Sequence, residues 1–281
     1  MLNGMTATKP QRRWFQCSLR TLLLPMLLAI IWLAVKMQQA TCQREAVKKL
    51  GGHVSWEVSW VESSPRWFIF LRRMVLGSFF GSIRSVSFFS DSQITDGGLE
   101  NLKGLSQIQD FCLIGTPVTD TGLEHLKGFT QLRTLLLSGT QVTDAGLENL
   151  KGFSELETLH LSSTQLTGVG LEQLKGLNKL RFLYLDRTKV TDAGMEHLTG
   201  LSRLQWLELS GTHVTGAGLE HLKGFSQLQT LGLDNTQVTD AGLDHLTGVS
   251  QLRWLDLRGT QVTKEGVKKL QRALPYCQIS R

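Results

Sequence analysis

The chain has 281 residues, with 30 Lys and Arg against 24 Asp and Glu and a formal net charge of +6. This length is too great for a typical single compact domain. Much of the positive excess lies in the first 73 residues, and beyond them Lys and Glu are interspersed, as in "LEHLKGF". Such a mixture is typical of a solvated helix face and excludes a nucleic-acid-binding patch.

Residues 1–20 form a basic leader, and an apolar run follows at residues 21–37. The stretch between Arg20 and Lys36 is short, because a membrane span needs about 20 apolar residues, but both basic side chains can reach the membrane surface. A cleaved signal peptide would need a small residue where Gln38 stands. A buried core helix is the remaining alternative. The basic flanks favour a single transmembrane anchor.

The orientation of this anchor does not follow from charge. Four basic residues precede the run and four follow it, so the positive-inside rule does not decide; they are Lys9, Arg12, Arg13 and Arg20 before it and Lys36, Arg44, Lys48 and Lys49 after it. We expect an uncleaved signal anchor with a cytoplasmic leader. The protein would then be a single-pass membrane protein whose remaining residues lie outside the cytoplasm.

Residues 38–50 predict a charged helical stalk. In "GGHVSWEVSW", apolar and polar residues alternate with the period of a strand. We interpret residues 51–83 as an N-terminal cap, because the repeats described next need one to cover their first core layer. An alternative assigns residues 64–83 to the membrane interface, where Trp67 and Phe68 would insert beside Arg66.

A 24-residue repeat fills residues 84–274. Its aliphatic anchor recurs eight times without insertion, at Ile94, Val118, Val142, Leu166, Val190, Val214, Val238 and Val262. In one unit Leu135 and Leu137 alternate as in a strand, and Leu147 and Leu150 have helical spacing. Each unit therefore predicts a short strand, a turn and about two turns of helix.

Local signals place the ends of this helix. Thr143 or Asp144 can cap its start, and an aspartate there also suits the positive end of the helix dipole. Gly152 suits a left-handed residue just past its end. One unit cannot bury its own apolar stripe, whereas stacked units can, so the repeats predict a solenoid.

The pattern L-x-x-L-x-L-x-x-T-x-[VIL]-T-D-x-G-L-x-x-L resembles the leucine-rich repeat family, and its cysteine-containing subclass in particular. The resemblance implies an α/β solenoid with a parallel sheet on the concave face and short helices on the convex face. Threonine replaces the usual Cys or Asn of that subclass, at Thr116, Thr140, Thr164, Thr188, Thr212, Thr236 and Thr260. Its hydroxyl can still bond the loop backbone.

The period breaks after Leu270, and residues 275–281 predict a C-terminal cap that ends in a short strand. The chain has four cysteines, Cys17, Cys42, Cys112 and Cys277. Several repeats separate Cys112 from Cys277, and strands stack about 4.8 Å apart, so a disulfide cannot join them. We expect no structural disulfide within the chain.

No motif of an enzyme occurs in the sequence: it lacks a phosphate-binding loop, a zinc-protease helix and a nucleophile elbow. One column of the repeat carries histidine in four units, His125, His197, His221 and His245. Neighbouring helices lie about 8–10 Å apart, too far for these side chains to share a metal ion. We expect no catalytic residue, no metal and no cofactor.

The residues that flank and separate the core leucines of each strand point away from the core. In the later repeats this outward set combines aromatic rings with carboxylates, which gives rigid contact area and selects cationic or hydroxyl groups. We predict partner binding on the concave face by Phe182, Tyr184, Asp186, Trp206, Glu208, Asp234, Trp254, Asp256 and Arg258. The alternative is a purely structural role, in which the rings only pack over neighbouring strands.

These features favour a membrane-anchored interaction scaffold that binds a protein or peptide without catalysis. The resemblance extends to anchored bacterial repeat proteins and to the repeats of F-box proteins. A substrate-recognition subunit of a ubiquitin ligase is therefore an alternative, although an apolar anchor stands where its helical F-box module would be. A structural spacer of the cell envelope is a third. The sequence does not predict the oligomeric state.

Overall fold

The computed structural model describes residues 45–57, 82–103 and 105–281. By internal contacts the chain divides into two units, Met1–Cys42 and Gln43–Arg281, and the described residues all belong to the second. The predicted leader and anchor, and most of residues 64–83, lie outside the described residues. Within the described part, every helix is too short or too polar to cross a bilayer.

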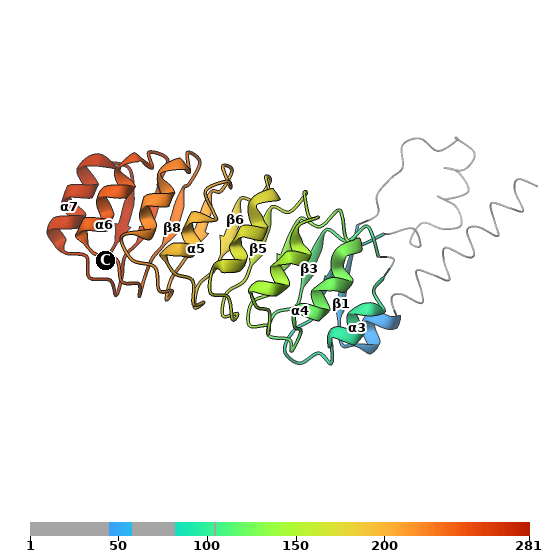
Figure 1. The fold of residues 1–281 in the computed structure, drawn as a ribbon. Helices are drawn as coiled ribbons and strands as arrows, with labels where there is room; N and C mark the ends of the chain where they lie inside the picture. The colour runs from blue at the N-terminus through green and yellow to red at the C-terminus, as the bar shows by residue number, and fades with distance from the viewer. Residues whose placement is uncertain (1–44, 58–81, 104) are drawn as a thin grey trace, which may run out of the picture. The chain divides into compact units, whose positions relative to one another are not determined.

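The described strands form one continuous sheet in strict chain order (Figure 1). Its members are β1 (His53–Glu57), β2 (Ser82–Ser87), β3 (Asp110–Cys112), β4 (Thr134–Leu136), β5 (Thr158–His160), β6 (Phe182–Tyr184), β7 (Trp206–Glu208), β8 (Thr230–Gly232), β9 (Trp254–Asp256) and β10 (Gln278–Ser280). β1 runs antiparallel to β2, and every later pair is parallel. Equivalent residues of successive repeats are exact neighbours, as in Leu135 beside Leu159.

The helices cover one face of this sheet (Figure 1). They are α3 (Asp96–Glu100), α4 (Asp120–Glu124), η1 (His125–Gly128), η2 (Asp144–Leu150), η3 (Val169–Gly176), α5 (Asp192–Glu196), η4 (Gly218–Gly224), α6 (Asp240–Leu243), η5 (Asp244–Gly248) and α7 (Lys264–Ala273). Many are 3₁₀ rather than α-helical, because the tighter turn fits a short connection. The predicted α/β solenoid of strands and short helices is confirmed.

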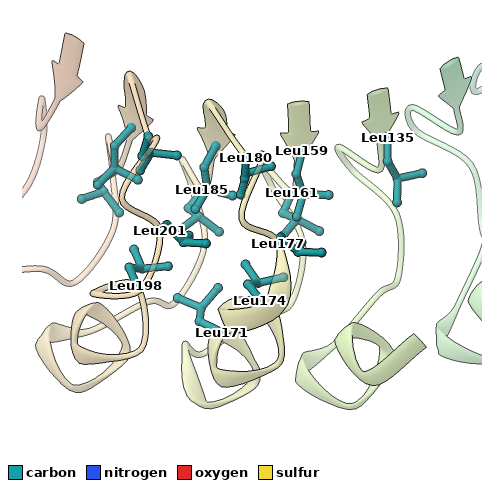
Figure 2. Packing of buried hydrophobic residues seen from close by; sticks show 14 of the residues in the cluster. Leu135, Leu159, Leu161, Leu171, Leu174, Leu177, Leu180, Leu185, Leu198 and Leu201 are labelled. Atoms are coloured by element: carbon teal, nitrogen blue, oxygen red, sulfur yellow. The ribbon is translucent and has the colours of Figure 1, made fainter. Parts of the chain in front are cut away.

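Leucine side chains fill the space between the sheet and the helices (Figure 2). In one repeat Leu135 and Leu137 point inward from the strand and Leu147 and Leu150 from the helix, and all four are fully buried. The intervening Leu136 is half-buried on the outer side. The predicted inward and outward alternation is therefore confirmed, and the outward row defines a surface that we call the sheet face.

A threonine closes the turn after each strand from β3 to β9, and all of these threonines except Thr260 are buried. The Thr140 hydroxyl donates to the Leu137 carbonyl at 2.7 Å, and the threonines of the other repeats make the same bond. The predicted loop bond is thus confirmed. The left-handed residue was predicted wrongly at Gly152. It lies instead just before this threonine, for example at Gly139 (φ 69°), because the chain reverses there rather than at the helix end.

Aspartates at the helix starts connect successive repeats. Asp120 accepts from the Thr143 N–H at 2.8 Å and from its hydroxyl at 2.6 Å. Thr143 in turn caps η2 by accepting from the Ala145 N–H. Asp144 does not cap its own helix, as one prediction allowed, but reaches the Thr167 hydroxyl at 2.6 Å in the next repeat. Stacking of the repeats places the Thr167 hydroxyl of the next repeat within hydrogen-bonding distance of the Asp144 carboxylate.

Both ends of the described sheet bury apolar side chains. Val47, from the segment predicted as a stalk, is fully buried with Phe88. At the other end β10 pairs with β9, and Cys277 and Leu274 are buried beneath it. The last predicted short strand is therefore present. Free cysteines among the described residues are Cys112 and Cys277, both buried.

Candidate functional site

The sheet face between β5 and β8 carries the densest group of rings and carboxylates. We call this group the sheet-face patch and define it by His160, Tyr184, Trp206, Asp186, Glu208 and Asp234. Each side chain is half-buried, whereas the leucines between them on the strands are fully buried. The parallel pairing without offset places His160, Tyr184 and Glu208 at the same level of adjacent strands.

The three rings of the patch contact one another across the strands. The His160 and Tyr184 rings are stacked, with centroids 3.8 Å apart and planes at 22°. Trp206 lies on the other side of Tyr184, with ring centroids 5.9 Å apart and planes at 33°. Tyr184 is therefore held between two neighbours, and the rings form a fixed aromatic platform.

Serine hydroxyls contact the three carboxylates. Ser162 donates to Asp186, and Ser210 is within hydrogen-bonding distance of both Glu208 and Asp234. The Glu208 side chain leans across Gly232, where an added Cβ would overlap the carboxylate. The absence of a side chain at Gly232 therefore lets Glu208 lie beside Ser210 and Asp234.

Burial and mutual repulsion shift the titration of the patch. Burial raises the pKa of Glu208, hydrogen bonds from Ser210 oppose this, and the charges of Asp186 and Asp234 raise it further. Burial also raises the pKa of Tyr184, helped by Glu208 and Asp186. Burial lowers the pKa of His160, with Asp186 opposing, so this imidazole is neutral at neutral pH. The patch thus carries negative charge.

Asp256, the last carboxylate predicted for the sheet face, is paired with a cationic side chain of the same chain. Arg258 binds Asp256 through Nε and Nη2, with Nε at 2.9 Å from Oδ1, and covers it so that only 7% of Asp256 is exposed. This ion pair holds the pKa of Asp256 below its usual range, although burial opposes the shift. Trp254 stands beside them with 40% of its surface exposed.

The predicted set does not include His160 of the patch, nor Ser162, Ser210 and Gly232, which border the patch. All four lie on the outward row, but an isolated histidine, serine or glycine does not stand out among polar strand residues. The strand register could have identified some of them. Because equivalent positions lie 24 residues apart, His160 pairs with Tyr184, and Gly232 pairs with Glu208.

A polar hollow of about 420 Å³ lies at the edge of the sheet where β5, β6 and β7 begin. It is lined by Glu157, Lys179, Arg181, Arg203, Gln205 and Gln227. Arg181 donates to Gln205 at 2.9 Å, and its guanidinium lies 5.4 Å from the centre of the Phe182 ring. A cation therefore lies over one face of the half-buried Phe182 ring.

No group of side chains among residues 45–57, 82–103 and 105–281 is arranged to hold a metal ion. The four histidines of the repeated column are half-buried on the helix side of the repeats. The patch itself offers rings, carboxylates and hydroxyls on an open surface. Such an arrangement suits recognition of a surface on another molecule.

A single row of repeats, with a parallel sheet on one side and short helices on the other, defines an α/β solenoid. Residues 130–190 and 154–214 match the leucine rich repeat family. This match and the solved structures described next confirm the sequence resemblance to the leucine-rich repeat family. Proteins of this class are typically noncatalytic scaffolds for protein–protein interaction.

Two solved structures show the same architecture. Internalin C2 of Listeria monocytogenes is 28% identical, with a TM-score of 0.58 over 70% of this chain and 81% of that chain. A second internalin of the same organism is 19% identical, with a TM-score of 0.55 over 65% of this chain and 49% of that chain, and this likeness concerns the fold alone. No curated protein matches the chain.

Proposed function

We propose that this protein is a membrane-anchored, noncatalytic scaffold that binds a protein or peptide partner on its sheet-face patch. The observation that carries the proposal is the aromatic platform of Tyr184 between His160 and Trp206, bordered by carboxylates. Half-buried rings held in fixed positions lose little conformational freedom on binding, which makes them effective contact residues.

Random-peptide display against the full chain in detergent tests this binding role. Peptides selected on the wild-type protein should bind at least about tenfold more weakly after Tyr184→Ala with Trp206→Ala, because such anchors dominate interface energies. A matched control replaces Leu136, on an earlier strand of the same face, by alanine and should leave binding unchanged. Selected peptides that bind the double variant as well as the wild type would refute the assignment.

The membrane anchor is proposed for residues 21–37, with the repeats outside the cytoplasm. The basis is the apolar run between Arg20 and Lys36. Alkaline extraction of membranes should leave the full chain in the pellet, and a variant with the run deleted should appear in the supernatant. Protease added to intact cells should cleave the repeats if they face outward. Extraction of the full chain at high pH would contradict the anchor.

A further inference from the structure

None of the three carboxylates of the sheet-face patch forms an ion pair within the described structure; one cation, Arg258, feels the charge of Asp234 but is itself bound to Asp256. The ion pairs of residues 45–57, 82–103 and 105–281 involve other acidic residues, and none includes Asp186, Glu208 or Asp234. The neighbouring imidazole of His160 is neutral at neutral pH. A concentrated negative charge therefore borders the aromatic platform.

Two carboxylates of the patch share one serine hydroxyl, and Glu208 also accepts from the Ser210 backbone N–H at 3.3 Å. Ser210 carries a single hydroxyl proton but lies against both Glu208 and Asp234, so it can donate to only one of them. Asn235 donates to the other oxygen of Asp234 at 2.8 Å. Glu208 and Asp234 consequently retain acceptor capacity that a ligand with several N–H donors would satisfy.

A neighbouring repeat shows what such a ligand looks like on this sheet. Asp256 occupies the strand position equivalent to Glu208, since both pair in register with Gly232. There the Arg258 guanidinium binds the carboxylate through two nitrogens. At the patch the corresponding residue two positions after the strand carboxylate is Ser210, which supplies no cation.

From the aromatic platform, the unpaired carboxylates and this comparison, we propose that the sheet-face patch binds an arginine side chain of an extended basic peptide segment, with the guanidinium against the Tyr184–Trp206 rings and its N–H groups toward Glu208 and Asp234. The proposal rests on the proposed function and names the chemistry of its partner. Arginine fits better than lysine because a planar guanidinium both stacks on rings and donates to two carboxylates, whereas an ammonium is a strongly hydrated point charge.

An end-capped oligo-arginine peptide with a fluorescent label is the probe, titrated with the full chain in detergent and followed by anisotropy. Oligo-citrulline of equal length is the matched neutral probe, because it keeps the shape of arginine without its charge. We expect oligo-arginine to bind at least about tenfold more tightly than oligo-citrulline and more tightly than oligo-lysine. Equal binding of oligo-lysine or of oligo-citrulline would overturn the proposal.

Variants then locate the site. Glu208→Gln with Asp234→Asn should weaken oligo-arginine binding by about tenfold or more, since two charge-assisted hydrogen bonds are lost. Gly232→Ala should also weaken it without changing charge, because the new Cβ displaces the Glu208 carboxylate. Tyr184→Phe should preserve binding, and Tyr184→Ala should reduce it. Circular dichroism of each variant verifies that the fold is retained.

A control for nonspecific attraction removes the same charge elsewhere. Glu148→Gln with Glu172→Gln neutralises two exposed carboxylates on the helix side and should leave binding unchanged. If this control weakens binding as much as the patch variant does, the attraction is general and the proposal is wrong. Display-selected peptides that need Tyr184 and Trp206 but tolerate arginine-to-citrulline exchange would refute the arginine site and leave the binding function standing. Failure to select any patch-dependent peptide would instead count against the binding function.

Discussion

The His160 imidazole stacks on the Tyr184 phenol with ring centroids 3.8 Å apart, although the two residues are separated by a whole repeat in the chain. Parallel pairing without offset makes them direct neighbours on β5 and β6. Side chains at the same level of adjacent strands stabilise a sheet by their contacts. The ring stack of the sheet-face patch therefore also contributes to the stacking of the repeats.

The burial of His160 predicts a pH dependence of stability. Its folded-state pKa lies below the usual 6.5, so the unfolded chain takes up the proton first as the pH falls. The stabilising contribution is complete above about pH 6.5 and is lost as the pH falls toward the folded-state value. The Tm of the wild type should therefore fall more between about pH 7.5 and about pH 5 than the Tm of the His160→Phe variant does. Identical losses would contradict this reading.

The aspartate bridges between repeats predict a local loss of stability. Asp120→Ala removes the acceptor of both the Thr143 N–H and its hydroxyl. Leaving such donors without a protein partner costs about 1–3 kcal/mol in free energy of unfolding. Urea denaturation followed by circular dichroism measures it as a lower midpoint. Glu148→Gln, an exposed charge on the helix surface, is the control and should change the midpoint little; an equal shift in both variants would argue against the bridge.

Close backbone contacts predict opposite effects for two glycine substitutions. A Cβ at Gly194 would lie 2.9 Å from the Gly168 Cα in the preceding repeat, so Gly194→Ala should destabilise the fold by roughly 1–3 kcal/mol. A Cβ at Gly152 meets nothing within 4 Å. Gly152→Ala should therefore stabilise by about 0.4–1 kcal/mol, because alanine restricts the unfolded chain. A destabilised Gly152→Ala protein would show that this residue does need a glycine conformation.

The buried thiols predict protection from alkylation. Burial raises the pKa of Cys277 to about 11 and raises that of Cys112 as well, so little reactive thiolate is present near neutral pH. Iodoacetamide should leave both residues unmodified in the folded protein and alkylate both in urea, as peptide mass spectrometry would show. Rapid modification of Cys277 under native conditions would indicate that the C-terminal end of the sheet opens.

The sequence predicted the sheet-face patch in part, and the reason for the remainder is spatial. Tyr184, Trp206 and Glu208 stand on an outward row that the alternation of strand residues defines. That Asp256 is covered by Arg258 could not be read from alternation, because it depends on a side-chain conformation chosen from several. Likewise, the space over Gly232 that Glu208 occupies exists only when adjacent strands are in place.

The repeat period by itself determined the architecture. A regular spacing of leucines requires each unit to bury its apolar residues against the next unit. The strand order, the parallel pairing of the repeats and the core residues therefore follow from the amino-acid sequence alone. The tertiary structure decided where each polar group finds its partner. Asp144 bonds the following repeat rather than its own helix, and the left-handed turn residue lies before the buried threonine rather than at Gly152. The physical reason is that hydrogen bonds are short and directional, so their partners depend on distances between repeats that no local pattern encodes.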